Sequence, residues 1–203
     1  MEKYDQNRSL ISTGDLILFR NNKTRKSLSK LIQKFDKAYY NHIGVVFSFG
    51  EGANRRLMII DSNAKGVQPD MLSARMNIYE DFCVLKPRPD WREQPRIEEA
   101  VSNVMAQADS RIEYDIPLLL EIAIERSLGR NVMSLNQQNK DICSEFAYRY
   151  AKALFSIAYD LTREQWGWIS PQDFLRFRDK KEFNLLLDTN PQSHPDYDGG
   201  NKK

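Results

Sequence analysis

The sequence predicts an α+β protein in which an antiparallel sheet packs against helices. Apolar runs with the length of strands are concentrated in the first half of the chain, whereas apolar positions at helical spacing dominate the second half. The 203 residues are enough for one domain with a sizeable core. With 41% hydrophobic and 29% charged residues, the composition excludes a disordered or collagen-like chain.

The expected strands share apolar cores bounded by turn residues. Residues 15–20 (DLILFR) are typical of a buried strand, and a short amphipathic helix is expected at 27–39. The runs 42–47 and 56–61 are joined by a loop with two glycines, which is a β-hairpin signal. A further strand is predicted at 78–87, where prolines then stop the pairing.

The expected helices are marked by their first residues. Pro95 opens a helix with one apolar face, and a second helical segment is expected at 117–128. Asp141 is predicted to be the N-cap of a third helix that begins with ICSEFAYRYAKALF. The sequence SPQD at 170–173 predicts a capping box that opens a short final helix.

The chain is expected to form a single folded unit with two polar extensions. Residues 1–13 are interpreted as an N-terminal arm, and 14–188 as one domain. Residues 189–203 are rich in turn-forming and polar residues and are predicted to be a flexible tail. No internal repeat divides the domain further.

The charge balance and the scarcity of cysteine and histidine exclude several classes of function. Lys and Arg number 30 against 28 Asp and Glu, and the two signs are mixed along the chain, so nucleic acid is not an expected partner. Two cysteines and two histidines are too few for a disulfide scaffold. A Cys/His zinc site would need nearly all of them, and we expect neither a metal nor a cofactor.

The sequence carries no signal for export or membrane insertion. The first residues lack the apolar run of a signal peptide, and the longest apolar stretch, 116–124, is too short for a bilayer and contains Glu121. We therefore expect a cytoplasmic protein, or one carried in a virus particle assembled in a cytoplasm. The oligomeric state is not predicted.

Cys143 is the candidate nucleophile because it lies near the first turn of a predicted helix. Free N–H groups and the helix dipole favour a thiolate there. The dipole contributes only about 0.3 to 1 kcal/mol, so an activated thiol also needs a cationic partner, which is usually histidine. The alternative interpretation of Cys143 is a small buried hydrophobic residue. Cys83 lies within a predicted strand and is interpreted as structural.

His42 is the candidate base, since the other histidine, His194, lies in the predicted tail. If the hairpin loop centres between Glu51 and Gly52, His42 faces Asp61. Asp61 could then accept a hydrogen bond from the imidazole and fix its tautomer.

Two other interpretations remain open for this pair. A slip of one residue would turn the two side chains to opposite faces, and Ser62 or Asn63 would then compete for the orienting role. His42 could also be a structural histidine at a strand start, and Asp61 a strand-end or turn residue.

The chain resembles a known family, the permuted NlpC-like papain-fold hydrolases, whose relatives include YiiX-type bacterial proteins and the lecithin:retinol acyltransferase group. The resemblance covers residues 14 to 174 and rests on an ordered set of short motifs. They are GDLILFR (14–20), NHIGVV (41–46), IIDSNAKGVQ (59–68), YD (114–115), ICSEFAY (142–148) and SPQDF (170–174).

The resemblance implies a circularly permuted papain-like fold and a Cys-His-Asp triad. It implies that Cys143 is the nucleophile, His42 the base and Asp61 the third residue, a position often occupied by Glu in the family. Tyr114 is similar to a tyrosine that lies beside the thiol and helps to hold the oxyanion; its alternative is a core tyrosine. The interval from Tyr114 to Cys143 is longer than usual, which implies a helical insertion at about 116–140.

Two classes of function follow. The first is a cysteine hydrolase or acyltransferase that cleaves an amide or ester bond in a peptide, a cell-wall peptide or an acyl lipid through a thioester acyl-enzyme. The second is a catalytically silent binding or structural protein that retains the fold. The rate at which Cys143 is alkylated near pH 6 discriminates between them.

Overall fold

The computed structural model describes residues 2–20, 39–63, 65–79, 81–88, 94–109, 113–114, 140–155, 170–175 and 183–189. The strands are β1 (Leu16–Arg20), β2 (His42–Phe49), β3 (Arg56–Asn63), β4 (Gly66–Met71), β5 (Asp81–Pro87), β6 (Glu113–Tyr114), β7 (Lys140–Asp141) and β8 (Phe183–Asp188). The helices are α1 (Glu2–Asn7), α3 (Leu72–Ile78), α4 (Gln94–Asp109) and α6 (Cys143–Phe155), with the 3-10 turns η1 (Gly52–Asn54) and η3 (Pro171–Asp173).

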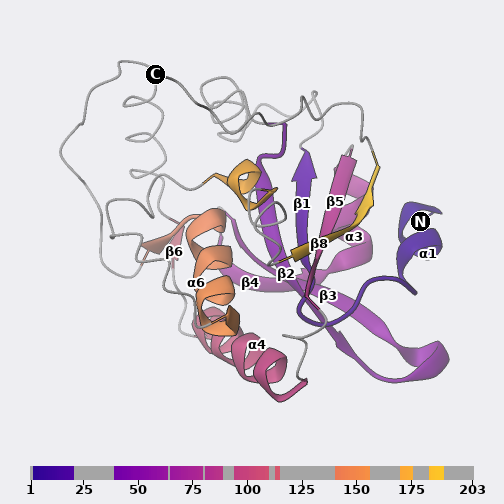
Figure 1. The fold of residues 1–203 in the computed structure, drawn as a ribbon, viewed down its shortest axis with the longest axis horizontal. Helices are drawn as coiled ribbons and strands as arrows, with labels where there is room; N and C mark the ends of the chain where they lie inside the picture. The colour runs from indigo at the N-terminus through magenta and orange to yellow at the C-terminus, as the bar shows by residue number, and fades with distance from the viewer. Residues whose placement is uncertain are drawn as a thin grey trace.

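The fold is built on an open six-stranded sheet of order β4-β3-β2-β1-β5-β8, in which every neighbouring pair is antiparallel. The helices α4 and α6 lie together beside this sheet (Figure 1). The predicted α+β class, with an antiparallel sheet packed against helices, is confirmed. A separate parallel pair joins β6 to β7.

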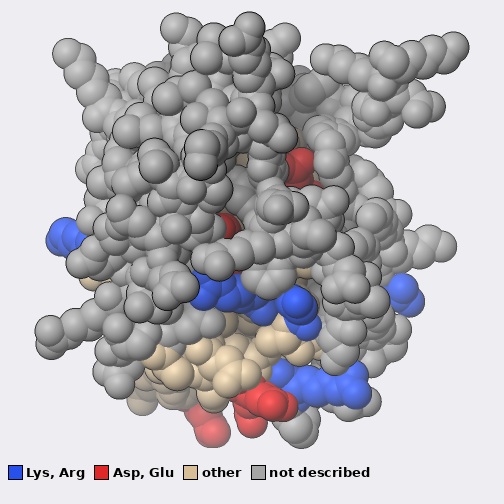
Figure 2. Space-filling model, turned by 90° about the vertical axis from the view of Figure 1, so that its left-hand side faces the viewer, with Lys and Arg blue, Asp and Glu red and all other residues tan. Residues whose placement is uncertain are grey.

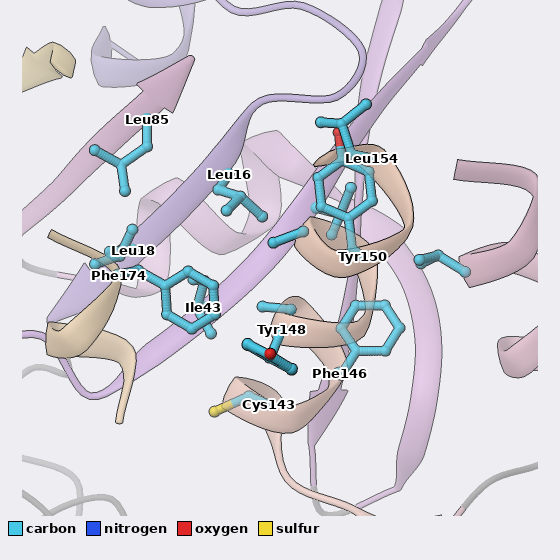
Figure 3. Close-up of a cluster of buried hydrophobic side chains, with 14 of the residues drawn as sticks. Leu16, Leu18, Ile43, Leu85, Cys143, Phe146, Tyr148, Tyr150, Leu154 and Phe174 are labelled. Carbon is cyan, nitrogen blue, oxygen red and sulfur yellow. The ribbon is translucent and has the colours of Figure 1, made fainter. Parts of the chain in front are cut away.

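The sheet carries a hydrophobic cluster on each face, which explains the uninterrupted apolar run of β1. Leu16 and Leu18 join a cluster with residues of α4 and α6, part of which is drawn in Figure 3. Ile17 and Phe19 join a second cluster with residues of α1 and α3. Because successive strand residues point to opposite faces, a strand that is covered on both sides has no polar positions to alternate with.

The hairpin forms as expected, but its register differs from the predicted one by two residues. Gly44, and not His42, lies opposite Asp61, and Phe49 lies opposite Arg56. The prediction placed the centre of the loop too early, because β2 continues to Phe49 and η1 fills the connection. A shift of two residues keeps every side chain on its face, since the side-chain period of a strand is two.

The predicted strand at 78–87 is too long at its start. Its first residue, Ile78, ends α3, and β5 begins at Asp81. The reason is that Leu72 and Met76, four positions apart on α3, are both buried in the second cluster. That spacing stabilises a helix immediately before the strand.

Both edge strands of the sheet are absent from the prediction. β4 contains Pro69, which a strand accommodates at the edge of a sheet, where one side of the backbone has no partner strand. β8 pairs with β5 with a register shift between Val84 and Leu85. Thr189 continues this contact, because its Oγ1 lies 2.9 Å from the N of Phe82.

The expected helix starts in the second half are partly confirmed. α4 begins at Gln94, next to Pro95, as expected. The capping box of Ser170 and Asp173 forms and opens η3. The prediction of Asp141 as an N-cap is wrong, because Asp141 belongs to β7 and α6 begins two residues later.

The N-terminal arm packs against the sheet. Tyr4 of α1 and Ile11 are buried in the second cluster. Arg55 holds this segment, because its Nη2 donates to the carbonyl oxygen of Ile11 over 2.6 Å. Lys86 donates to the carbonyl oxygen of Leu10 over 2.8 Å.

Several predicted features lie outside the described residues. They are most of the expected helix at 27–39, the helix at 117–128, most of the insertion at about 116–140, and residues 190–203.

Replacing Gly14 by alanine is expected to lower the free energy of unfolding by about 2 to 4 kcal/mol. Gly14 has a φ of 88°, and a Cβ there would lie 2.7 Å from Ile97 and 2.8 Å from the hydroxyl of Tyr150. That hydroxyl donates to the carbonyl oxygen of Gly14 over 2.7 Å, so it has little freedom to move. Urea unfolding measures the loss.

Gly52→Ala is the matched control, because Gly52 also has a positive φ, 51°, but a Cβ there meets nothing within 4 Å. It should cost about 1 kcal/mol, the strain of the left-handed backbone alone. Equal losses in the two variants would contradict the steric explanation.

Candidate active site

His42 is the first residue of β2 and lies beside two aromatic rings. It is 8% exposed. The ring of Tyr79 stacks on the imidazole with centroids 5.7 Å apart and an interplanar angle of 17°, and the ring of Phe19 lies 6.3 Å away. These contacts restrict the imidazole to one plane.

The structure brings His42 and Asp61 together. Nε2 of His42 lies 2.9 Å from Oδ2 of Asp61, whose side chain is fully buried. Because Gly44 is the residue directly opposite Asp61, the two side chains meet as diagonal neighbours on one face of the sheet. The predicted contact therefore exists, although the predicted register is wrong.

The second oxygen of the Asp61 carboxylate is held by two further donors. Nδ2 of Asn63 donates to Oδ1 over 2.8 Å, and Nη2 of Arg75 donates to the same oxygen over 3.0 Å. Asn63 thus supports Asp61 and does not replace it as the partner of His42. The carboxylate cannot rotate without breaking these bonds, which leaves Oδ2 facing the imidazole.

Cys143 is the first residue of α6, as expected, and is 3% exposed. Figure 3 shows it at one end of the helix, with Leu154 toward the other end. The helix start is fixed by Glu145, whose Oε2 accepts from the N of Ile142 over 3.3 Å, and by a bond from the N of Phe146 to the carbonyl oxygen of Ile142. Glu145 therefore acts as the reciprocal half of a cap.

The side chain of Cys143 is one of the groups whose interaction with His42 raises the pKa of the histidine. Burial by itself lowers the pKa of His42, but the electrostatic interactions with Tyr79 and Asp61, the bond to Asp61 and the interaction with Cys143 outweigh it. The net pKa lies well above the ordinary value of 6.5. An imidazolium beside the sulfur is thus favoured.

The pKa of Asp61 moves in the opposite direction. Burial raises it, but the charge of His42, the hydrogen bond to His42 and the charge of Arg75 outweigh burial, so the pKa lies below its ordinary value of 3.8. His42, Asp61 and Cys143 therefore form a connected chain of polar side chains. Such a chain can hold a thiolate–imidazolium pair, with Nε2 bound to the carboxylate and Nδ1 left for the thiol.

Tyr114 lies in β6, where its backbone pairs with Asp141 in parallel. This pairing brings it next to the segment that enters α6, despite the long interval in sequence. The side chain of Tyr114 lies outside the described part of the structure. Its role at an oxyanion remains a prediction.

The remaining cysteine and histidine are Cys83 and His194. Cys83 is fully buried in β5, opposite Leu18, as expected of a structural residue. His194 lies outside the described residues. Among the residues that the structure describes, no group of three or more His, Cys, Asp or Glu could hold a metal ion.

The described surface shows no membrane-spanning helix and carries both signs of charge. Within the described ranges, no helix combines the length and the apolar character needed to cross a bilayer. Figure 2 views the side of the molecule that carries α4 and α6, and both basic and acidic side chains are visible there. Charges of opposite sign close together produce little net field.

Comparison of the sequence with models of known protein families and with curated protein sequences finds no match.

Sequence reasoning missed Arg75 of α3 and Tyr79, the residue that directly follows α3, which both contact the His42–Asp61 pair. They are four positions apart and thus lie on one side of a helical turn. The spacing of Leu72 and Met76 could have indicated the helix. The prediction of a strand from Ile78 placed Tyr79 in that strand and left Arg75 in an unassigned segment.

Asp61→Asn is expected to lower the free energy of unfolding by about 3 kcal/mol near pH 5. The reason is that His42 and Arg75, which are both positively charged at this pH, lose the carboxylate that they bind. The raised pKa of His42 contributes stability that is complete below pH 6.5 and is lost as the pH rises through the folded value. The lowered pKa of Asp61 contributes stability that is complete above pH 3.8 and is lost in acid. The stability gap between wild type and variant should thus be largest between these values.

Urea unfolding at a series of pH values measures the gap, with the exposed Asp5→Asn as the control. A gap that stays constant across the pH range would show that the two groups are not linked in this way.

Proposed function

We propose that the protein is a cysteine hydrolase or acyltransferase of the permuted NlpC-like papain fold, acting on an amide or ester bond through Cys143, His42 and Asp61. The observation that carries the proposal is the position of His42, whose Nε2 lies 2.9 Å from the buried carboxylate of Asp61 and whose pKa the side chain of Cys143 helps to raise. Nucleophile, base and orienting acid in that order are the elements of a thiol triad.

In the first half of the reaction, the Cys143 thiolate attacks the carbonyl carbon of the substrate and forms a carbon–sulfur bond. The oxyanion of the tetrahedral intermediate is stabilised by N–H groups at the start of α6, which have no partner within the helix. The imidazolium of His42 then gives its proton to the leaving nitrogen or oxygen. The bond to the leaving group breaks, and a thioester remains on Cys143.

In the second half, neutral His42 takes a proton from water or from another acceptor as its oxygen attacks the thioester. The carbon–sulfur bond breaks, the acyl group leaves as an acid or a new ester, and Cys143 and His42 return to the ion pair. No cofactor takes part in either step. Asp61 keeps Nε2 protonated, so that Nδ1 exchanges the proton with the reactants.

The ordered motifs support the family assignment, because the described ones fall on the elements that build the site. GDLILFR supplies β1, NHIGVV begins β2 with the base, and IIDSNAKGVQ carries Asp61 at the end of β3. ICSEFAY opens α6 with the nucleophile, and SPQDF forms η3. Gln172 of this last motif accepts from the N of Tyr40 over 3.1 Å, which ties η3 to the segment before the base.

Native protein labelled with iodoacetamide near pH 6 is expected to react rapidly at Cys143, because a neighbouring imidazolium keeps the sulfur ionised. His42→Ala should slow this labelling about 100-fold or more, the usual scale of a lost acid–base partner. The extent of labelling is measured by mass spectrometry of the intact protein and its peptides.

The matched control is Cys83→Ala, since Cys83 is buried in β5 and is not a member of the proposed triad. It should leave the labelling of Cys143 unchanged. A thiol at Cys143 that reacts only above about pH 8, with or without His42, would contradict the proposal and favour a silent binding protein that retains the fold.

Electrophilic probes with peptidyl and with acyl-chain recognition groups then separate the substrate classes. Covalent capture by one probe set, lost in Cys143→Ala, identifies a peptide or cell-wall peptide substrate on the one hand or an acyl lipid on the other. Failure of both sets, in protein whose Cys143 still reacts with iodoacetamide, would contradict both substrate classes.

A further inference from the structure

We propose that Arg75 is a positioning residue that holds Asp61 permanently ionised and thereby sets the pH range in which His42 exchanges its proton. The inference rests on the proposed function, because it concerns the same triad. Arg75 acts through Asp61 and is not itself placed against the reacting atoms.

The geometry connects Arg75 to Asp61 and to a second acid. Nη2 of Arg75 lies 3.0 Å from Oδ1 of Asp61, and its Nε lies 3.3 Å from Oδ2 of Asp70. The side chain of Arg75 is 14% exposed and that of Asp61 is 0% exposed, whereas that of Asp70 is 42% exposed. Asp70 on β4 thus anchors the guanidinium from the solvent side, and Asp61 binds it from the inside.

The need for Arg75 follows from what happens to His42 during turnover. His42 is an imidazolium before it protonates the leaving group and a neutral imidazole afterwards. A fully buried carboxylate beside a neutral imidazole is strongly disfavoured unless another cation remains. Arg75 supplies that cation throughout, because a guanidinium does not lose its proton at any working pH.

Orientation alone does not account for Arg75. Asn63 already donates to Oδ1 over 2.8 Å and prevents the carboxylate from rotating. What Arg75 adds to the same oxygen is a full positive charge. The contribution specific to Arg75 is therefore electrostatic, and a charge-neutral replacement should reveal it.

The charged and titratable groups that face the pair come from each element packed on it. Asp61 lies on β3, Asp70 on β4, Arg75 on α3, Tyr79 just after α3, and Cys143 at the start of α6. The positive charge of Arg75 repels the imidazolium of His42, and both cations are attracted to the single negative charge of Asp61. Removing the guanidinium should strengthen the hold of Asp61 on the His42 proton.

The test is an NMR titration of the histidine ring signals. The chain has two histidines, so His194→Gln in every sample leaves the His42 signal alone. In Arg75→Gln the midpoint of His42 is expected to rise by about one pH unit, and Arg75→Lys, which keeps the charge, should restore it toward the wild-type value. Arg56→Gln removes an exposed arginine of β3 and should leave the midpoint unchanged.

An unchanged or lower midpoint in folded Arg75→Gln would overturn the inference, as would an equal rise in Arg75→Lys. If Arg75→Gln does not fold, Asp70→Asn decides the question. Asp70 is partly exposed, and its removal leaves the charge of Arg75 wholly to Asp61, so the midpoint should fall. A midpoint that stays at the wild-type value in Asp70→Asn would overturn the inference.

The pH profile of Cys143 alkylation separates this inference from the proposed function. If the role of Arg75 and the proposed function are both correct, the pH profile of Cys143 alkylation moves to higher pH in Arg75→Gln together with the NMR midpoint of His42. If the NMR midpoint rises but wild-type Cys143 shows no labelling near pH 6 that depends on His42, Arg75 tunes the pair as inferred and the thiol hydrolase proposal fails. If that labelling is present and neither measurement moves in Arg75→Gln, the role of Arg75 is overturned and the proposed function stands.

Discussion

The buried carboxylate of Asp61 is the constraint on which the rest of the site depends. It has no access to solvent, yet it is the acceptor for His42, Asn63 and Arg75. A charge in that position is tolerated only where the fold supplies donors on both of its oxygens. The end of β3, the helix α3 and the start of β2 must therefore meet at one point, and their meeting fixes the orientation of His42.

The sheet and α6 together determine what the fixed histidine can do. His42 begins β2 and Cys143 begins α6, so each stands at the end of its element. Glu145 and the N of Ile142 close the first turn of α6 and hold the sulfur in place. In the proposed mechanism, N–H groups at the same helix start would stabilise the oxyanion, so that one element would supply both the nucleophile and the oxyanion donors.

The hairpin shows why the predicted contact between His42 and Asp61 was correct although the predicted register was not. The centre of the loop lies later in the chain than predicted, and the true register differs by two residues. Because the side chains of a strand alternate with a period of two, His42 and Asp61 still share a face and meet on the diagonal. A register shift of one residue would have placed the two side chains on opposite faces of the sheet. The predicted contact therefore depends on whether the shift is odd or even, and not on the exact pairing.

The amino-acid sequence by itself determined the α+β class, the strands of the central hairpin and the positions of His42, Asp61 and Cys143, because these depend on local apolar patterns and on the rarity of cysteine and histidine. It did not reveal β4 and β8, whose edge positions permit polar residues and proline, nor α3, whose apolar face is only two residues long. Only the tertiary structure decided that Arg75 and Tyr79 surround the His42–Asp61 pair. Their contacts join residues from β2, β3 and α3, and a contact between separate elements leaves no periodic signal in any one of them.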